Sequence, residues 1–327
     1  MPKITVLGSG GWGMALAISA FNNGCDVTLW SPFKDEVENL KKNRTNERLL
    51  NGVYLPEGIN ITDDLSVVTD DTITIIATPS TAVGDVAKKL KAYKNIGIVV
   101  NVSKGFEPGG LRRLSEVIRE HLPEAPIVAL TGPSHAEEVA RNIPTSIVAA
   151  SNSGTAALVV QDIMASKFLR IYTSDDIIGA ELGGAIKNVI AIAAGFCDGM
   201  GLGDNTKAAL ITRGLSEMAR LGICMGAKEY TFAGLTGIGD LVVTCTSRHS
   251  RNNRFGNLVG KGMPIKEALA EVGTVEGYYA AKMAHELAVK YKVELPIINE
   301  CYQVLYENRD VKDVVNDLMT RPNKSEH

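Results

Sequence analysis

Short apolar stretches rich in β-branched residues alternate with amphipathic stretches through the first half of the chain. The amphipathic stretches repeat at helical spacing and cover residues 12–23, 83–90 and 111–121. The apolar stretches are predicted strands, and they cover residues 4–7, 27–30, 73–77, 96–100, 127–130 and 147–149. Strands that are apolar on both faces and separated by helices are typical of a parallel sheet with helices on both sides. The pattern therefore predicts an α/β fold with an N-terminal, Rossmann-like, doubly wound parallel sheet.

The second half of the chain has a different pattern. After about Asp175, long segments rich in Ala, Leu and Ile are separated by glycine clusters, and strand-like alternation is almost absent. We therefore predict an all-helical C-terminal domain. The change in pattern places the domain boundary near residue 179, with residues 1–179 in the first domain and residues 180–327 in the second.

Composition and charge argue against several classes of protein. The 327 residues are 45% hydrophobic and carry a formal net charge of -3, with no long block of one sign. A nucleic-acid or membrane-surface protein would need a basic footprint, so neither partner is expected. The cysteines are odd in number and form no CxxC pair, which argues against disulfides and against a zinc site, and which fits a reducing compartment. They are Cys25, Cys197, Cys224, Cys245 and Cys301.

The chain also lacks the usual signals for export or membrane insertion. The predicted strand at Ile4 follows the N-terminus directly and leaves no room for a signal peptide. The apolar stretch at residues 185–197 is interrupted by Lys187 and Asn188, so no bilayer span is expected. We therefore expect a cytoplasmic protein.

A glycine-rich segment follows the first predicted strand and opens the first predicted helix. It matches GxGxxG and consists of Gly8, Ser9, Gly10, Gly11, Trp12 and Gly13. In this context, Gly8 allows a tight turn, Gly10 lets the backbone approach a pyrophosphate, and Gly13 lets the helix pack on the strand. The helix N-terminus supplies N–H groups to the phosphates. The segment therefore predicts a dinucleotide site.

The end of the second predicted strand bears on which dinucleotide is bound. An NAD-specific protein usually carries an acid there for the ribose 2′-hydroxyl, whereas this chain has Ser31 and Pro32. Basic residues follow at Lys34, Arg44 and Arg48, and they favour the 2′-phosphate of NADP, alongside NAD. Each of these basic residues is equally well explained as a solvated surface charge, and the acids Asp35 and Glu36 weaken the expectation.

One lysine in the second half has unusual neighbours. Leu182, Ile186 and Val189 belong to the apolar stripe of a predicted helix, whereas Lys187 lies on another face. The residues that flank Lys187 at helical spacing are all small, namely Gly183, Gly184, Ala191 and Ala194. A helix or a ligand must therefore approach this face closely. The alternative is a lysine that extends past a packed helix to solvent.

Two further segments carry polar groups at helical spacing. Asp240 and Thr244 lie one turn apart and share a face if this region is helical. Ser250 is a predicted N-cap, and Arg251 and Asn252 would then lie in a first helical turn beside open backbone N–H groups. This arrangement predicts a phosphate cradle. A plain capped helix with an exposed arginine is the alternative.

With these motifs in place, the chain resembles a known family over nearly its full length: soluble, bacterial-type NAD(P)-dependent glycerol-3-phosphate dehydrogenase. The motifs are GSGGWG at 8–13, NVSKGFE at 101–107, LTGPSHAEEVA at 130–140, ELGGAIKNVIAIAAG at 181–195, GDNTKAALITRG at 203–214, LTGIGDLVVTCTSRHSRN at 235–252 and VEG at 275–277. The chain departs from the family pattern at Gly11, where a hydroxyl residue is frequent, and at Ser31–Pro32, where a basic residue often follows the strand.

The resemblance implies roles for individual residues. Lys187 matches the catalytic lysine, Lys104 a lysine near both cofactor and substrate, and Asp240 the acid beside the reacting centre. The implied substrate-binding residues are Lys104, Gly132, Ser134, Lys187, Asn188, Asp240, Thr244, Ser250, Arg251 and Asn252. The implied cofactor-binding residues are Gly8, Ser9, Gly10, Gly11, Trp12, Gly13, Ser31, Pro32, Lys104, Ala136, Arg251, Val275 and Glu276.

The resemblance also implies a reaction. Dihydroxyacetone phosphate would be reduced to sn-glycerol 3-phosphate by hydride transfer from NADPH or NADH, without a metal, to supply phospholipid synthesis. Lys187 would handle the proton on the C2 oxygen, and Asp240 would orient the lysine. A homodimer is also expected. Two alternatives remain: a β-hydroxyacid or ketopantoate-type dehydrogenase, and an NAD(P)-sensing binding protein, which would not need Lys104, Lys187 and Asp240 together.

Overall fold

The computed structural model describes residues 1–70, 72–93, 96–323 and 325–326. The chain divides into two compact units, Met1–Glu181 and Leu182–His327. The division falls inside one long helix, α7 (Ile177–Gly199), rather than in a loop.

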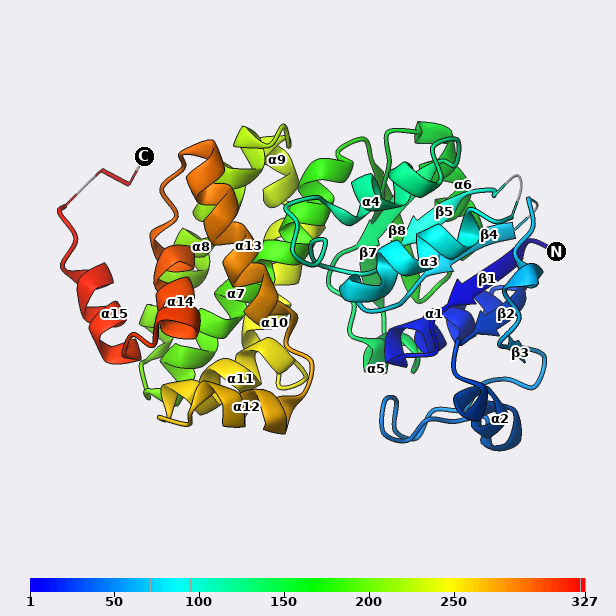
Figure 1. Ribbon diagram of the computed structural model, residues 1–327, viewed down its shortest axis with the longest axis horizontal. Helices are drawn as coiled ribbons and strands as arrows, with labels where there is room; N and C mark the ends of the chain where they lie inside the picture. Colours follow the sequence, from blue (N-terminus) through cyan, green and yellow to red (C-terminus); the bar gives the residue numbers. More distant parts are fainter. Residues whose placement is uncertain (71, 94–95, 324, 327) are drawn as a thin grey trace. The chain divides into compact units, whose positions relative to one another are not determined.

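The N-terminal unit is built on a single sheet. In the described part of the chain the sheet has eight strands, in the spatial order β3-β2-β1-β4-β5-β6-β7-β8. Figure 1 shows this sheet with its helices. The bounds of the strands are β1 (Lys3–Leu7), β2 (Asp26–Trp30), β3 (Asn60–Thr62), β4 (Thr72–Ile76), β5 (Val99–Asn101), β6 (Ile127–Thr131), β7 (Thr145–Ala150) and β8 (Leu169–Ser174). The order reverses beside β1, which pairs with both β2 and β4, and this reversal defines a doubly wound sheet.

Strand direction confirms the predicted Rossmann-like sheet, with a difference at one edge. The strands from β3 to β6 are parallel, whereas β7 runs antiparallel to β6, pairing Ala129 with Ala150. β8 is parallel to β7. The sequence pattern did not predict β3 or β8, and it did not predict the reversal. β8 is exposed on one side because Arg170 and Tyr172 alternate with buried residues.

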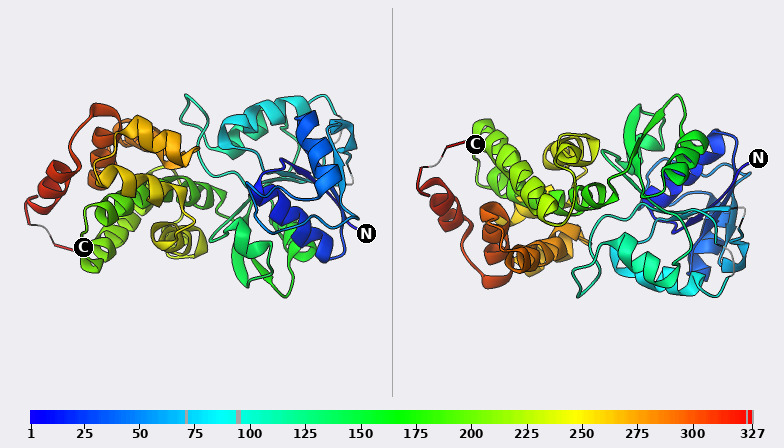
Figure 2. Two further views of the ribbon diagram at one scale, coloured as in Figure 1. Left: turned by 90° about the horizontal axis from the view of Figure 1, so that it is seen from below. Right: turned by 90° about the horizontal axis from the view of Figure 1, so that it is seen from above.

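Helices cover both faces of this sheet (Figure 2). One apolar cluster joins one face to helices such as α1 and α6 through side chains including Leu16 and Val160. A second cluster joins the other face to α3 and α4 through side chains including Leu90 and Ile118. The helices of this unit are α1 (Gly11–Asn22), α2 (Lys34–Asn43), α3 (Val83–Leu90), α4 (Leu114–His121), α5 (Ala136–Val139) and α6 (Gly154–Met164).

The start of α7 is tied to α4 within the N-terminal unit. The Glu181 carboxylate accepts hydrogen bonds from the Ser115 backbone N–H at 2.8 Å and from the Arg113 guanidinium at 2.7 Å. Burial raises the pKa of Glu181, and the Arg113 charge opposes that effect. A positively charged partner thus lowers the cost of burying this carboxylate.

The C-terminal unit is helical, as the sequence predicts. Its α-helices are the rest of α7, α8 (Asp204–Cys224), α9 (Glu229–Phe232), α10 (Asp240–Thr246), α11 (Arg251–Gly260), α12 (Ile265–Val272), α13 (Glu276–Tyr291), α14 (Pro296–Glu307) and α15 (Val311–Met319). A π-helical turn, Leu235–Gly239, leads directly into α10.

Helix α7 is the apolar centre of the C-terminal unit. By length and composition alone it could cross a membrane, so Lys187 and Asn188 interrupt the apolar stretch less than the sequence argument assumed. However, 94% of its apolar segment is buried inside the protein. The helix is therefore a core helix, whose apolar character is explained by packing.

Candidate functional site

The glycine loop, residues 8–13, connects β1 to α1 in the geometry that the motif predicts. Gly8 has a φ of +125°, and a Cβ atom there would lie 2.5 Å from the carbonyl oxygen of Ala77. A Cβ atom at Gly13 would collide with the carbonyl oxygen of Gly8. In contrast, a Cβ atom at Gly10, the N-cap of α1, would meet nothing within 4 Å. The open space beside this helix N-terminus fits a pyrophosphate.

The departure at Gly11 has a steric reason. A Cβ atom there would lie 2.8 Å from the carbonyl oxygen of Leu49 and 3.8 Å from the Cβ of Ala136. The segment that carries Leu49 thus takes the space that a side chain at position 11 would need. The neighbouring Trp12 is partly buried against the apolar cluster under α1.

A carboxylate joins the two turns that follow β1 and β2. The hydroxyls of Ser9 and Ser31 donate to the same oxygen of Glu36, Oε2, at 2.7 Å and 2.5 Å. Ser9 and Ser31 are buried, Glu36 is half-buried in the first turn of α2, and Pro32 is exposed. The sequence analysis named both serines, and it named Glu36 only as an acid that weakens the expectation of NADP. The sequence feature that could have identified Glu36 as a cofactor residue is its place as an acid shortly after the second strand of a GxGxxG unit.

Lys104 lies with two of the predicted substrate-binding residues. Its Nζ donates to the carbonyl oxygen of Gly132 at 3.0 Å, and it lies 3.5 Å from the hydroxyl of Ser134. These residues follow β5 and β6, whose carboxyl ends lie at the same edge of the sheet. Ligands of doubly wound folds bind at this edge.

The lysine cluster, Lys187, Asp240 and Thr244, lies inside the C-terminal unit. Lys187 Nζ donates to Asp240 Oδ1 at 2.5 Å and to Thr244 Oγ1 at 2.7 Å. The Thr244 hydroxyl donates to the Asp240 carbonyl oxygen at 2.6 Å. Lys187 is only 5% exposed, so the alternative of a lysine that extends to solvent is wrong. Asp240 and Thr244 share a face because α10 is helical here.

One of the small residues beside Lys187, Gly183, has a packing role. A Cβ atom at Gly183 would collide with the carbonyl oxygen of Thr236, in the π-helical turn before α10. Close contact between α7 and this turn places α10 against the lysine face. A helix therefore approaches this face, and the approach brings Asp240 to Lys187.

A buried thiol lies in the electrostatic environment of the lysine cluster. Burial raises the pKa of Cys245 to about 12, and the positive charge of Lys187 opposes this effect. The thiol is therefore protonated at neutral pH and is a poor nucleophile. Within residues 1–70, 72–93, 96–323 and 325–326, no three His, Cys, Asp or Glu side chains are placed to hold a metal ion.

The amide bridge, Asn188, Asn252 and Gly277, connects three helices one residue along from Lys187. Asn252 donates through Nδ2 to Asn188 Oδ1 at 2.9 Å and accepts from the Gly277 backbone N–H at 2.9 Å. Asn188 lies on α7, Asn252 on α11 and Gly277 on α13. The bridge holds the starts of α11 and α13 against α7.

The start of α11 agrees with the predicted capped helix. The Ser250 hydroxyl accepts from the Asn253 backbone N–H at 3.2 Å, and Ser250 is the N-cap. Arg251 is the first residue of the helix, and its side chain is exposed. Asn253, which the sequence interpretation passed over, donates to Asp198 Oδ2 at 3.0 Å and so anchors this turn to α7. The predicted cofactor residues Val275 and Glu276 are the N-cap and first residue of α13.

Helices α7 and α11 also touch through their main chains. A Cβ atom at Gly195 would lie 2.8 Å from the Cα of Gly256, and one at Gly260 would lie 3.2 Å from the Cα of Gly199. Two glycines one turn apart on each helix thus allow backbone contact. This contact fixes the start of α11 relative to the lysine on α7.

Comparison with known proteins assigns both units to one family. Models of the N-terminal and C-terminal domains of NAD-dependent glycerol-3-phosphate dehydrogenase match residues 3–157 and 176–316. The protein named glycerol-3-phosphate dehydrogenase (NAD(P)+) from Fusobacterium nucleatum is 50% identical over 331 residues, covering 100% of this chain and 99% of that protein. The protein of the same name from Desulfitobacterium hafniense is 48% identical, covering 100% and 93%.

A solved structure extends this similarity to three dimensions. The crystal structure of glycerol-3-phosphate dehydrogenase from Coxiella burnetii is 38% identical to this chain, and the two superpose with a TM-score of 0.93. The match covers 98% of this chain and 99% of the Coxiella chain. With both domain models matched and relatives at this level of identity, the chain belongs to the NAD-dependent glycerol-3-phosphate dehydrogenase family.

Proposed function

We propose that this protein is an NAD(P)-dependent oxidoreductase that reduces dihydroxyacetone phosphate to sn-glycerol 3-phosphate by hydride transfer. The observation that carries this proposal is the lysine cluster: a buried ammonium held by Asp240 and Thr244, in a chain of this family. Such an ammonium is suited to proton transfer to a carbonyl oxygen.

Lys187 is the proposed acid of the reductive reaction. The Asp240 carboxylate at 2.5 Å stabilises the charged ammonium, which is the form that can give a proton to the ketone. Its proton passes to the C2 oxygen as that oxygen becomes a hydroxyl. Asp240 holds the amine in place, and Thr244 fixes its direction. In the oxidative direction Lys187 must lose its proton first, which the Asp240 charge disfavours.

The start of α11 is the proposed phosphate site. Arg251 supplies an exposed guanidinium in the first turn, and backbone N–H groups of the same turn add a partial positive charge. Ser250, Asn252 and Asn188 complete the proposed site from the N-cap and the amide bridge. Thr244, Gly132 and Ser134 remain proposed substrate contacts.

The glycine loop is the proposed cofactor site, because its turn closes without side chains and leaves the N-terminus of α1 open. When bound, the reduced cofactor supplies the hydride. Lys104 is proposed to contact both cofactor and substrate. The other proposed cofactor residues are Ser9, Trp12, Ser31, Pro32, Ala136, Arg251, Val275 and Glu276.

The cellular role follows from the product. We propose that the protein supplies glycerol phosphate for phospholipid synthesis, acts in the cytoplasm and forms a homodimer. The burial of α7 in the protein core supports the first of these last two proposals, because a buried helix is not available to cross a membrane.

The test is a reductive assay that follows the loss of NADH or NADPH absorbance with dihydroxyacetone phosphate as substrate. Dihydroxyacetone, which lacks the phosphate, is the control and should react far more slowly because it cannot use the binding energy of the phosphate. Equal rates with both ketones, or no turnover of the phosphorylated one, would contradict the proposal. Lack of turnover together with normal cofactor binding would indicate a nucleotide-binding protein instead.

A further inference from the structure

The Glu36 carboxylate is held where two loops of the N-terminal unit meet. Gly8 donates its backbone N–H to the Trp30 carbonyl oxygen at 2.9 Å, so the turn after β1 lies against the end of β2. Ser9 follows Gly8 and Ser31 follows Trp30, and both hydroxyls donate to Glu36 Oε2. The serines thus fix the side chain of a residue that the motif itself does not contain.

This position has a chemical consequence for the adenosine half of a dinucleotide. In doubly wound folds, an acid near the end of the second strand accepts a hydrogen bond from the ribose 2′-hydroxyl of NAD, whereas NADP carries a phosphate there. Both serine hydroxyls donate to Oε2, and neither of these bonds involves Oε1. A ribose hydroxyl can donate to this carboxylate, whereas a 2′-phosphate would be repelled by it.

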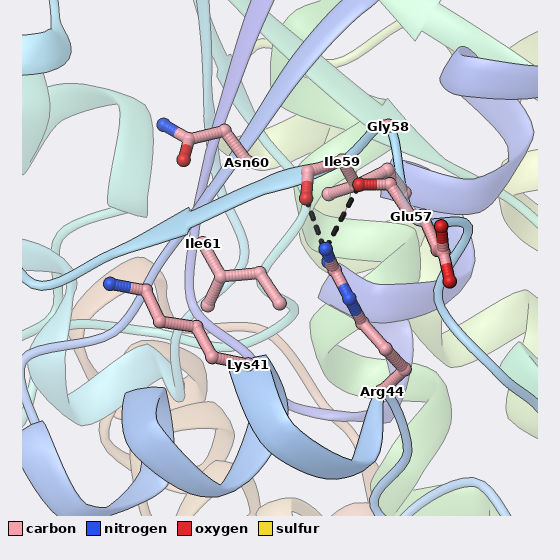
Figure 3. Close-up of a pocket in the computed structure, with 7 residues that line it drawn as sticks. All are labelled: Lys41, Arg44, Glu57, Gly58, Ile59, Asn60 and Ile61. Atoms are coloured by element: carbon pink, nitrogen blue, oxygen red, sulfur yellow. Dashed lines mark hydrogen bonds between the residues drawn. The ribbon is translucent and has the colours of Figure 1, made fainter.

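Arg44, one of the three basic residues that favoured NADP in the sequence, makes its hydrogen bonds away from this charge. Arg44 donates to the carbonyl oxygens of Ile59 at 2.8 Å and Glu57 at 2.9 Å, as Figure 3 shows. It lines a surface cavity of about 310 Å³ together with Lys41 and residues 57–61, and that lining includes none of the three residues of the Glu36 site. Arg44 thus serves to fix the segment before β3. The side chains of Lys34 and Arg48 are exposed.

We propose that Glu36, positioned by Ser9 and Ser31, is a specificity-determining residue that makes this protein prefer NADH to NADPH. Glu36 replaces the acid that is missing at Ser31 and Pro32, and it comes from the first turn of α2 instead of the end of β2. The proposal rests on the glycine loop as the cofactor site, and it reverses the preference expected from the sequence.

The experiment measures the dissociation constants of NADH and NADPH by titration of nucleotide fluorescence, without substrate. The variants are Glu36→Gln and Asp35→Asn, which remove one negative charge each from the first turn of α2. Wild type should bind NADH at least about tenfold more tightly than NADPH, and Glu36→Gln should lose most of this ratio through tighter NADPH binding. Asp35→Asn should keep the ratio within about twofold, since Asp35 is exposed and makes neither serine contact.

A third variant tests the positioning role. Ser31→Ala keeps the acid but removes one of its two donors, so the NADH:NADPH ratio should fall part of the way towards that of Glu36→Gln. A wild type without NADH preference overturns the proposal, and so does a Glu36→Gln ratio equal to wild type or a matching loss in Asp35→Asn. If wild type binds neither nucleotide, the proposed function itself fails, which is a distinct outcome.

Discussion

The glycine loop and the lysine cluster are positioned by different kinds of contact. In the loop, the main chain sets the geometry: Gly13 lets α1 approach Gly8, and Gly10 leaves space at the helix start. In the cluster, side chains from α7 and α10 set the geometry through hydrogen bonds of Lys187. A loop of the first kind is a local property of a few residues. A cluster of the second kind exists only after distant helices have packed.

Because of this difference, the two sites should tolerate different substitutions. The glycine loop contains few interactions that a polar substitution could remove, but an added methyl group can block it. The lysine cluster buries a charge pair, so the loss of either partner leaves an uncompensated charge in the interior.

The strongest test is Lys187→Ala. It should lower kcat by roughly 10²–10⁴, because a positioned acid is lost. NADH binding, measured by fluorescence, should remain close to wild type because the glycine loop lies in the other unit. Near-normal turnover would show that the lysine has only a structural role.

Loss of activity must be separated from loss of stability, because Lys187→Ala leaves Asp240 charged and buried. The double variant Lys187→Met with Asp240→Asn removes both charges and should regain much of the stability, measured by urea unfolding. It should remain inactive. Recovery of activity in the double variant would show that Lys187 takes no part in the reaction.

A second buried carboxylate sharpens the contrast between paired and unpaired charges. Burial raises the pKa of Glu217 to about 7, and the backbone N–H groups of Ile297 and Ile298 oppose this effect. The folded state therefore holds this proton more tightly than the unfolded state. The protonated Glu217 contributes its full share to the free energy of unfolding below about pH 4.5. This contribution is lost as pH rises through about 7, a change of about 3 kcal/mol.

Glu217→Gln should remove this pH dependence. Its free energy of unfolding relative to wild type should increase by up to about 3 kcal/mol between about pH 5 and pH 8, measured by urea unfolding. Glu271→Gln, on the exposed face of α12, is the control and should show no such change. A pH dependence that persists in Glu217→Gln would assign it to another group.

The phosphate site is tested by Arg251→Ala. A charge-assisted contact is worth about 1.5–3 kcal/mol, so the KM for dihydroxyacetone phosphate should increase about ten- to a hundredfold. The ratio of kcat/KM for dihydroxyacetone phosphate over dihydroxyacetone should collapse. Arg254→Ala is the matched control, since Arg254 is exposed on the same helix one turn further on. If both variants lose the same amount, the effect is a general one of surface charge.

The glycine loop should show the smallest effects on stability. Gly13→Ala should destabilise the protein by about 1–3 kcal/mol, because its Cβ collides with the Gly8 carbonyl oxygen. Gly10→Ala should cost less than about 1 kcal/mol but weaken NADH binding about tenfold or more, because its Cβ points into open space. Thermal melts and nucleotide titrations would distinguish the two. Equal changes in both variants would contradict the division between packing and binding.

What the sequence reveals follows the same division between local and distant contacts. The glycine loop, the Ser250 cap and the shared face of Asp240 and Thr244 depend on spacing within a few residues, and the sequence predicted their geometry. The pairing of Lys187 with Asp240 spans 53 residues and leaves no periodic signal, so it was implied by the family resemblance and not by the spacing of residues. The sequence did not predict the position of the Glu36 side chain for a related reason, because that position depends on hydroxyls in two separate turns.

The sheet shows the same limit. β3 has only three residues, two of them polar, and β8 carries exposed residues on one side, so neither resembles a strand buried on both faces. The reversal at β7 depends on how the connection from β6 returns, and neither strand encodes its direction in its own residues.

The main-chain contact between α7 and α11 sets the distance that the proposed substrate must span. Gly195 and Gly256 bring the two backbones into contact, so no side chain between them can move aside to let the helices come closer. The distance between the Lys187 amine and the first turn of α11 therefore cannot become shorter. A phosphorylated ketone must match that spacing with its own carbon chain. We therefore expect an analogue whose phosphate lies one carbon nearer the carbonyl to be too short to reach both groups, because the touching helices cannot move closer together.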